Sequence, residues 1–233
     1  MINLLFHKYQ PKYLEKKTPG WIGHLPLAYW IVSETKPRVL VELGTHLGNS
    51  YFTFCQSVKE NKLKTSCYAV DCWEGDVQAG QYEQGVYTTV QNYNDANYRQ
   101  FSKLLKMRFD EALHEIPDGT VDLLHIDGLH TYEAVRHDYE TWLPKLSANG
   151  LVMFHDIAVE REDFGVKKFW GELKKQYPCS LEFDHNHGIG VIFPHNGKCG
   201  YGFMKRGSLS QQMVHRVLSK RGIALAVANK TKK

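Results

Sequence analysis

The most informative stretch of this chain reads Val39-Leu40-Val41-Glu42-Leu43-Gly44-Thr45-His46-Leu47-Gly48-Asn49-Ser50. A β-branched apolar run ends at an acidic residue and then turns at a glycine, which is typical of a buried strand that leads into a ligand site. The turn is spaced Gly-x-x-x-Gly and lacks the Gly-x-Gly-x-x-Gly spacing that brings a helix N-terminus close to a pyrophosphate. The stretch therefore favours a cofactor without phosphates, with a ligand-free strand-to-helix turn as the alternative.

Glu42 supports the same interpretation through its charge. A carboxylate at the mouth of the strand would repel a phosphate and attract an ammonium group, such as that of S-adenosylmethionine. We therefore expect S-adenosylmethionine as the cofactor. Nicotinamide dinucleotides are disfavoured because the phosphate-binding spacing is missing.

The chain has 233 residues, of which 42% are hydrophobic, enough to bury the core of a single α/β domain. We expect an N-terminal extension over residues 1–20, a single domain over residues 21–200 and a basic C-terminal tail over residues 201–233. The formal net charge of +4 is mild, and a solvated basic end explains the tail better than binding to nucleic acid or lipid does.

Five cysteines, an odd number without a Cys-x-x-Cys pair, predict neither a disulfide framework nor a zinc knuckle. They favour a reducing, cytoplasmic compartment. No apolar stretch approaches the ~20 residues that span a bilayer, and the N-terminus is too short for a secretory signal. A homo-oligomer formed through the N-terminal segment or the apolar run Ile223–Val227 stays open.

Apolar periodicity predicts alternating strands and helices, which is the arrangement of a parallel sheet. Expected helices cover residues 26–35, 49–58, 96–105, 132–144 and 165–177. Expected strands cover residues 38–43, 66–71, 106–109, 121–126 and 151–154, followed by an antiparallel pair at 181–184 and 190–193. Residues 74–97 show little periodicity and suit a lid or an acceptor-binding loop.

Five successive strands end in acidic residues while their interiors are apolar. Because ligands of an open parallel sheet bind at the carboxyl ends of its strands, we expect these acids to gather around one site. They are Glu42, Asp71, Asp110, Asp127 and Asp156.

Two blocks carry a family resemblance: His125-Ile-Asp-Gly-Leu-His-Thr-Tyr-Glu-Ala-Val-Arg-His-Asp138 and Leu146-Ser-Ala-Asn-Gly-Leu-Val-Met-Phe-His-Asp156. From about Trp21 to Phe193 the chain resembles the class I S-adenosylmethionine-dependent methyltransferases, and within them a bacterial group with the sugar O-methyltransferases of macrolide and glycan biosynthesis. The resemblance implies a doubly wound, mostly parallel seven-stranded sheet with an antiparallel C-terminal hairpin. It also implies methylation of a hydroxyl on a small molecule or glycan.

Cofactor contacts follow from the residues and this resemblance together. The glycine turn would hold the methionine part, and the two oxygens of Asp71 suit a ribose diol. Trp73 could pack on the adenine or belong to the core, and Asp110 lies where similar enzymes place a polar group against the adenine amine. The expected contacts are Glu42, Gly44, Thr45, Gly48, Asn49, Ser50, Asp71, Trp73, Asp110 and Asp127.

Alcohol methylation needs a base or a Lewis acid, because the hydroxyl must lose its proton during transfer. His130 is the expected catalytic base, with Asp127 beside it, since an imidazole titrates near neutrality. Asp127 and Asp156 could bind Mg²⁺. Catechol-type enzymes have an amide side chain after the second acid, whereas this chain has Ile157, so a third ligand would come from elsewhere.

Other interpretations stay open for the same side chains. Asp127 could cap the following helix, and His155 could be a core histidine. The triad His125, Asp127 and His155 has the residue types of an Fe(II) oxygenase, and a non-catalytic cofactor-binding module of glycan machinery is a further alternative. His185 and His187 could line the acceptor cleft or be exposed to solvent. Tyr82, Tyr87 and Tyr93 could belong to a sugar-stacking lid or anchor the loop to the core.

Overall fold

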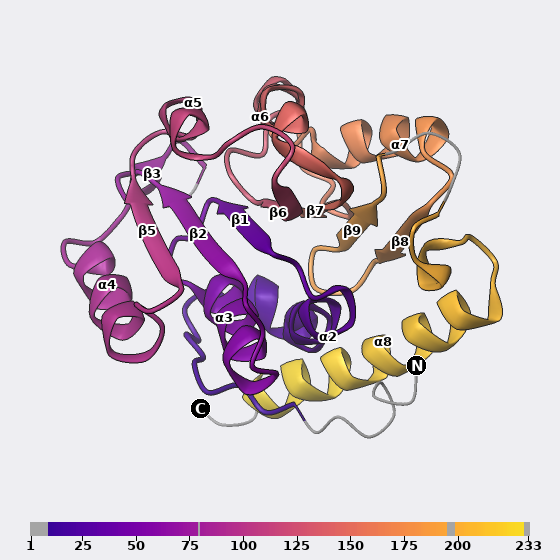
Figure 1. The fold of residues 1–233 in the computed structure, drawn as a ribbon, viewed down its shortest axis with the longest axis horizontal. Helices are drawn as coiled ribbons and strands as arrows, with labels where there is room; N and C mark the ends of the chain where they lie inside the picture. Colours follow the sequence, from indigo (N-terminus) through magenta and orange to yellow (C-terminus); the bar gives the residue numbers. More distant parts are fainter. Residues whose placement is uncertain (1–8, 79, 195–198, 231–233) are drawn as a thin grey trace.

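A seven-stranded sheet forms the centre of the protein in the computed structural model, which describes residues 9–78, 80–194 and 199–230 (Figure 1). The strand order is β5-β2-β1-β6-β7-β9-β8. Five strands pair in parallel, and β9 runs antiparallel to both β7 and β8. The predicted doubly wound sheet with an antiparallel C-terminal hairpin is confirmed. The bounds are β1 Val39–Leu43, β2 Ser66–Asp71, β5 Ser102–Lys106, β6 Val121–Ile126, β7 Leu146–His155, β8 Ser180–Phe183 and β9 Ile189–Ile192.

Helices cover both faces of this sheet (Figure 1). One face carries the 3₁₀ turn η1 (Pro19–His24) and the helices α2 (Leu25–Thr35), α3 (Asn49–Glu60), α4 (Val86–Asn97) and α8 (Leu209–Lys230). The other face carries α5 (Phe109–Ala112), α6 (Tyr132–Trp142) and α7 (Val166–Gln176). Short 3₁₀ turns complete the chain at η2 (Leu113–Glu115), η3 (Leu143–Lys145) and η4 (Gly202–Met204).

The strand β1 shows why the sheet needs both layers. Its side chains alternate, so that Leu40 enters the hydrophobic core under α2 and α3, while Val41 and Leu43 enter the core under α6 and α7. All three are fully buried. A strand buried on both faces reads as a continuous apolar run, which is why β1 was predictable from sequence.

The segment after β2 differs from the expectation. Residues 74–97 form a two-stranded hairpin, β3 (Gly75–Asp76) and β4 (Gly80–Gln81), followed by the twelve-residue helix α4. The strand β5 occupies residues 102–106, so the helix at 96–105 and the strand at 106–109 were wrong. Only Val90 and Asn94 of α4 are buried, and this helix therefore leaves little apolar periodicity in the sequence.

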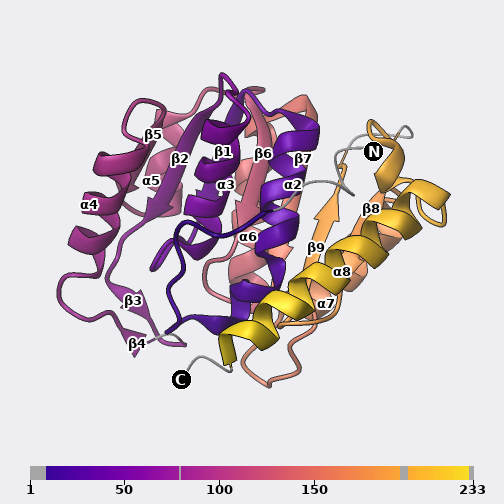
Figure 2. The same cartoon turned by 90° about the horizontal axis from the view of Figure 1, so that it is seen from below.

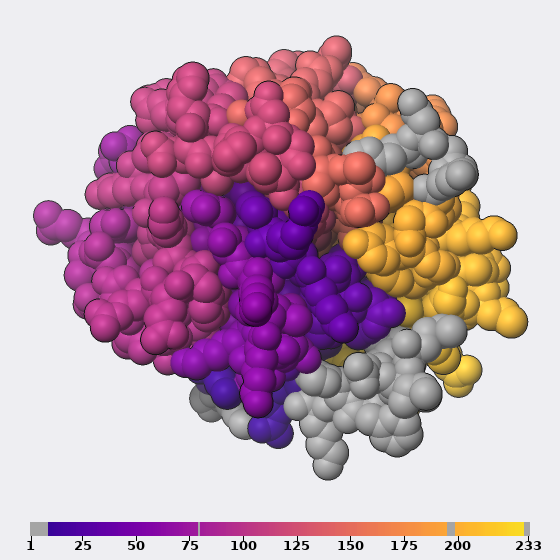
Figure 3. Space-filling model, viewed as in Figure 1, coloured from indigo at the N-terminus to yellow at the C-terminus, as the bar shows by residue number. Residues whose placement is uncertain are grey.

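The C-terminal residues expected as a solvated tail instead form α8, which packs against α2 and η1 (Figure 2). Val214 and Leu218 are buried, and a Cβ at Gly222 would lie 1.9 Å from the carbonyl oxygen of Gly23. The space-filling view shows the C-terminal residues in yellow directly beside N-terminal residues in indigo (Figure 3). This part of the basic segment therefore belongs to the folded body.

A disulfide joins Cys179, next to β8, to Cys199. It corrects the expectation drawn from the odd cysteine count and the missing Cys-x-x-Cys motif, because partners twenty residues apart leave no local signature. The cysteines therefore give no argument for a reducing compartment. Within the described ranges, no helix combines the length and the apolar character needed to cross a membrane.

Candidate functional site

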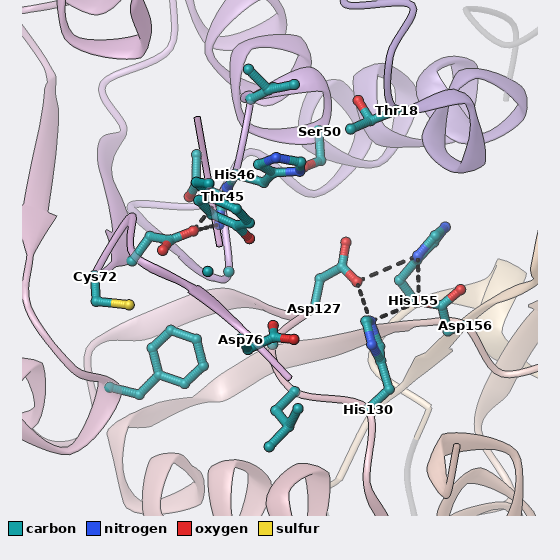
Figure 4. A pocket seen from close by; sticks show the side chains of 18 of the residues that line it. Thr18, Thr45, His46, Ser50, Cys72, Asp76, Asp127, His130, His155 and Asp156 are labelled. Carbon is teal, nitrogen blue, oxygen red and sulfur yellow. Dashed lines mark hydrogen bonds and ion pairs between the residues drawn. The ribbon is translucent and has the colours of Figure 1, made fainter. Parts of the chain in front are cut away.

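A cavity of about 630 Å³ opens at the carboxyl ends of the parallel strands. Its walls come from the turns that follow β1, β2, β5, β6 and β7 and from residues 18–21 of the N-terminal segment (Figure 4). The predicted convergence of acids holds for four of the five: Asp71, Asp110, Asp127 and Asp156 line the cavity.

Glu42 is the acid that does not reach this cavity. It is the fourth of five residues in β1, and its side chain points into the layer under α2 and α3. There it lies opposite His125 of β6, whose Nδ1 is 2.8 Å from Glu42 Oε2, and both side chains are fully buried. Glu42 is thus part of the floor beneath the site, because alternation along the strand turns its side chain away from the cavity. A direct contact with the cofactor stays a prediction.

The turn after β1 is held by Asp71. One Asp71 oxygen accepts hydrogen bonds from the backbone N–H groups of Thr45 (2.9 Å) and His46 (2.8 Å), and the other accepts from the N–H of Trp73 (2.7 Å). The oxygen that accepts from Trp73 makes only this one hydrogen bond and keeps a further lone pair for a ligand hydroxyl. The Thr45 hydroxyl is buried without a hydrogen-bond partner among the described residues, so the cavity offers unused polar capacity where a cofactor was expected.

The two glycines of this turn, Gly44 and Gly48, are in different structural situations. Gly44 has φ +87°, and a Cβ there would lie 2.1 Å from the carbonyl oxygen of Asp127. Glycine is therefore required at this position by the neighbouring strand end as well as by any ligand. Gly48 has φ +83° and precedes α3, whose first residues Asn49 and Ser50 also line the cavity.

Asn49 and Trp73 have other contacts than those expected. The Asn49 amide group donates to the Thr18 hydroxyl (2.8 Å) and accepts from the N–H of Glu15 (2.7 Å), so it fastens the N-terminal segment over α3. Trp73 is buried, packs against Tyr87 and donates its indole N–H to the His46 carbonyl. Trp73 does not line the cavity, and this favours the core interpretation over packing on an adenine.

The β5 side of the cavity corrects the expected position of Asp110. Asp110 lies in the first turn of α5 rather than directly after the strand, and its largely exposed carboxylate contacts His137 Nε2 at 2.9 Å. Asp138 of α6, which was not singled out from the sequence, is the buried acid on this wall. Burial raises the pKa of Asp138 to about 7, His137 opposes the rise and Asp110 adds to it.

A second group of side chains gathers where β6 and β7 end (Figure 4). His130 Nε2 lies 2.8 Å from Asp156 Oδ2 and 3.6 Å from Asp127 Oδ1. His155 Nδ1 lies 3.3 Å from the same Asp156 oxygen and 3.4 Å from the same Asp127 oxygen. His155 is therefore part of the site and not a separate core histidine.

The surroundings of this cluster resolve several alternatives. Thr131, whose hydroxyl accepts from the N–H of Ala134, caps α6, so Asp127 does not. The Asp127 carboxylate instead accepts a 2.6 Å hydrogen bond from the indole of Trp21, which stacks on His155. His125 points to Glu42, so the iron triad with His125 does not form.

His187 and Tyr82 also line the cavity, whereas the other side chains left open do not. His187 Nδ1 lies 3.1 Å from Asp156 Oδ1 without the direction of a hydrogen bond, and Tyr82 stacks on His46. His185 contacts the Gly23 carbonyl. Tyr87 packs on Trp73, and Tyr93 packs on Tyr13 and Phe52.

Opposite charges dominate the protonation of the cluster. Burial lowers the pKa of His130, but its contacts with Asp127 and Asp156 outweigh burial and raise that pKa to about 9. Burial also lowers the pKa of His155, but the carboxylates of Asp127 and Asp156 outweigh burial and raise that pKa to about 10. Burial would raise the pKa values of Asp127 and Asp156, yet the adjacent histidines hold both well below the usual range.

The donor set of this cluster fits a divalent cation. Asp127, His130 and Asp156 each place one donor atom within 4.8 Å of the others. Asp156 Oδ1 is buried and has no hydrogen-bond partner among the described residues, and Asp156 holds a φ of +61°, an uncommon conformation for a residue with a side chain. The 3.3 and 3.4 Å separations around His155 Nδ1 are close to the roughly 3 Å between neighbouring ligands of an octahedral ion.

Comparison with known proteins places this architecture in a family. A sequence profile of the family described as "Methyltransferase domain" matches residues 41–157. The uncharacterized protein y4gI of Sinorhizobium fredii is 46% identical over 184 residues, which are 79% of this chain and 20% of that protein. The chain thus spans about a fifth of the length of this curated relative.

Solved structures share the fold at low identity. The O-methyltransferase TomG from Streptomyces achromogenes, solved with S-adenosylmethionine, has a TM-score of 0.55 and 13% identity over 82% of this chain and 94% of its own. The methyltransferase PaMTH1 from Podospora anserina, solved with S-adenosylhomocysteine, has a TM-score of 0.55 and 14% identity over 72% of this chain and 76% of its own. The profile match spans half of the sequence, from β1 to just past the end of β7, and the chain therefore belongs to this family of methyltransferase domains.

Proposed function

We propose that this domain transfers the methyl group of S-adenosylmethionine to a hydroxyl group of a sugar or glycan, with His130 as the general base. The observation that carries this proposal is the placement of His130 Nε2, 2.8 Å from Asp156 in the wall of the cavity. A histidine in that position can take a proton from an acceptor oxygen bound against the two carboxylates. S-adenosylmethionine supplies the electrophilic methyl group, and the acceptor oxygen bonds to it as the carbon–sulfur bond breaks.

The cofactor would lie along the turns after β1 and β2. Asp71 and the unpartnered Thr45 hydroxyl are available for the ribose and methionine parts. Glu42, two residues before the turn, lies in the floor of the site and is paired with His125. Much of the rate would come from alignment, because methyl transfer needs its nucleophile, carbon and sulfur in line.

Mg²⁺ would be held by Asp127 and Asp156, with His155 as the third ligand that the sequence left unassigned. When bound, the ion would polarise the acceptor oxygen and lower the pKa of its hydroxyl. Its charge would also compensate the carboxylates that hold the His130 proton, so that His130 becomes a base at lower pH. An imidazole among the ligands suits Mn²⁺ or Fe²⁺ at least as well as Mg²⁺.

A sugar hydroxyl is favoured by the part of the cavity wall that the β3–β4 hairpin forms. Glu74 and Asp76 line the cavity there, and carboxylates accept hydrogen bonds from hydroxyl groups. Tyr82 adds an aromatic ring, stacked on His46 at 4.2 Å, which can pack against the apolar face of a sugar ring.

Two measurements test the proposal. Purified protein is incubated with S-adenosylmethionine and a panel of glycosides, nucleotide sugars, catechols and amines, and methylated products are sought by mass spectrometry. Methylation of a sugar oxygen supports the acceptor class, whereas exclusive methylation of catechols or amines contradicts it. Calorimetry with Mg²⁺ and Mn²⁺ tests the metal, since Asp156→Asn should abolish the binding heat seen with the unmodified protein.

A further inference from the structure

Gln78, on the β3–β4 hairpin, contacts the proposed base directly. Its side-chain oxygen Oε1 lies 2.9 Å from the backbone nitrogen of His130 and 3.0 Å from His130 Nδ1. Its amide nitrogen Nε2 donates to the carbonyl oxygen of Asp163 at 2.6 Å. One carboxamide therefore joins three segments: the hairpin, the turn after β6 and the loop after β7.

These partners determine which of the two imidazole nitrogens carries the hydrogen. The His130 backbone N–H can only donate and the Asp163 carbonyl can only accept, so the Gln78 oxygen must face His130. His130 Nδ1 must then be a donor, because it shares that acceptor oxygen. In the neutral ring the lone pair consequently belongs to Nε2, the atom that faces Asp156 and Asp127.

The plane of the imidazole is held as well. Phe164 stacks on His130 with 4.6 Å between ring centroids and 5° between ring planes. Arg161 lies 4.5 Å from the Phe164 ring centroid and pairs with the Asp163 carboxylate. The loop after β7 therefore supplies both the stacking ring and the carbonyl that orients Gln78.

We propose that Gln78 is a positioning residue for methyl transfer, which fixes the tautomer and direction of His130 so that Nε2 faces the acceptor. This inference rests on the proposed role of His130 as base. Because Gln78 lies within residues 74–97, the segment expected to contact the acceptor, the same hairpin would both contact the acceptor and orient the base. Partners that orient a functional imidazole in this way typically contribute 10–100-fold in activity.

Three variants test the inference. Gln78→Met removes the acceptor oxygen at similar length, Gln78→Glu keeps it, and Val77→Ala changes a neighbour on the same hairpin that is 90% exposed. We expect Gln78→Met to lower kcat about 10–100-fold while leaving the KM and the dissociation constant for S-adenosylmethionine unchanged. Gln78→Glu keeps the acceptor for His130 but loses the donor to Asp163, so it should lose less activity than Gln78→Met, and Val77→Ala should equal the unmodified protein.

A spectroscopic readout needs no turnover. In protein labelled with ¹⁵N-histidine, the hydrogen-bonded His130 Nδ1–H should give a protected downfield proton signal, assigned by its loss in His130→Ala. We expect this signal in the unmodified protein and in Gln78→Glu, and its loss in Gln78→Met. Persistence of the signal and of kcat in Gln78→Met would overturn the proposal, as would equal losses in Gln78→Met and Gln78→Glu. Failure of the proposed function would show differently, as an unmodified protein that has the signal but methylates no hydroxyl.

Discussion

Asp138→Asn should stabilise the protein increasingly as the pH rises. The Asp138 side chain is buried at the cavity wall, 7% exposed, and its carboxylate has no hydrogen bond from any described residue. Burial raises its pKa from 3.8 to about 7, so between these pH values the folded protein keeps a proton that the unfolded chain releases. Stability contributed by the protonated group is therefore complete below the unfolded pKa and is lost as the pH rises through the folded one.

The size of this loss follows from the difference between the two pKa values. At about 1.4 kcal/mol per pKa unit, it amounts to roughly 4 kcal/mol in total, of which about 3 kcal/mol falls between pH 5 and pH 8. Asparagine cannot ionise, so the variant avoids the loss. The gain in unfolding free energy of Asp138→Asn over the unmodified protein should thus be about 3 kcal/mol larger at pH 8 than at pH 5.

Urea unfolding at several pH values measures this difference. Asp95→Asn, at an exposed position of α4, controls for the loss of one negative charge. A gain that is the same at pH 5 and pH 8 would refute the reasoning, because it would mean that Asp138 does not keep its proton in the folded state. A buried, unpartnered acid retained in a cavity wall at this cost is typical of a ligand contact.

Gly44→Ala should destabilise the fold by more than about 3 kcal/mol, because it combines a positive φ with a backbone clash; a melting temperature equal to that of the unmodified protein would contradict the close packing against Asp127. Replacing both Cys179 and Cys199 by alanine should lower the unfolding free energy by about 3 kcal/mol through the loop that the disulfide closes, measured by guanidinium unfolding; an unchanged midpoint would argue against the bond. Turnover should rise with pH toward about 9 in metal-free protein, since the pKa of His130 is raised to about 9 and the base must be neutral. Saturating Mg²⁺ should move that rise to lower pH. A pH–rate profile that is the same with and without Mg²⁺ would contradict an effect of the ion on the pKa of His130.

The sequence predicted the strands that are buried on both faces. The runs at β1, β6 and β7 are apolar because a parallel sheet covered by helices leaves no solvent-facing side. The edge strand β5 and the helix α4 were misplaced because few of their residues are buried, and such elements leave weak periodicity.

The site was predictable where function depends on position along a strand. Asp71, Asp127 and Asp156 end or follow their strands and so reach the cavity. Glu42 does not reach the cavity, because a shift of one residue along a strand places a side chain on the opposite face of the sheet. Trp21 and Gln78 escaped notice because their partners lie 106 and 52 residues away in sequence, and only the folded chain brings such pairs together.

The most direct test of His130 as the general base is a single-turnover measurement of methyl transfer. Protein preloaded with S-adenosylmethionine is mixed with a sugar acceptor that the unmodified protein methylates. The variants compared are His130→Ala and, as control, His114→Ala at an exposed position. Our account predicts that both variants bind S-adenosylmethionine like the unmodified protein and that only His130→Ala fails to form the methyl ether. Methyl ether formation by His130→Ala at the unmodified rate would contradict it.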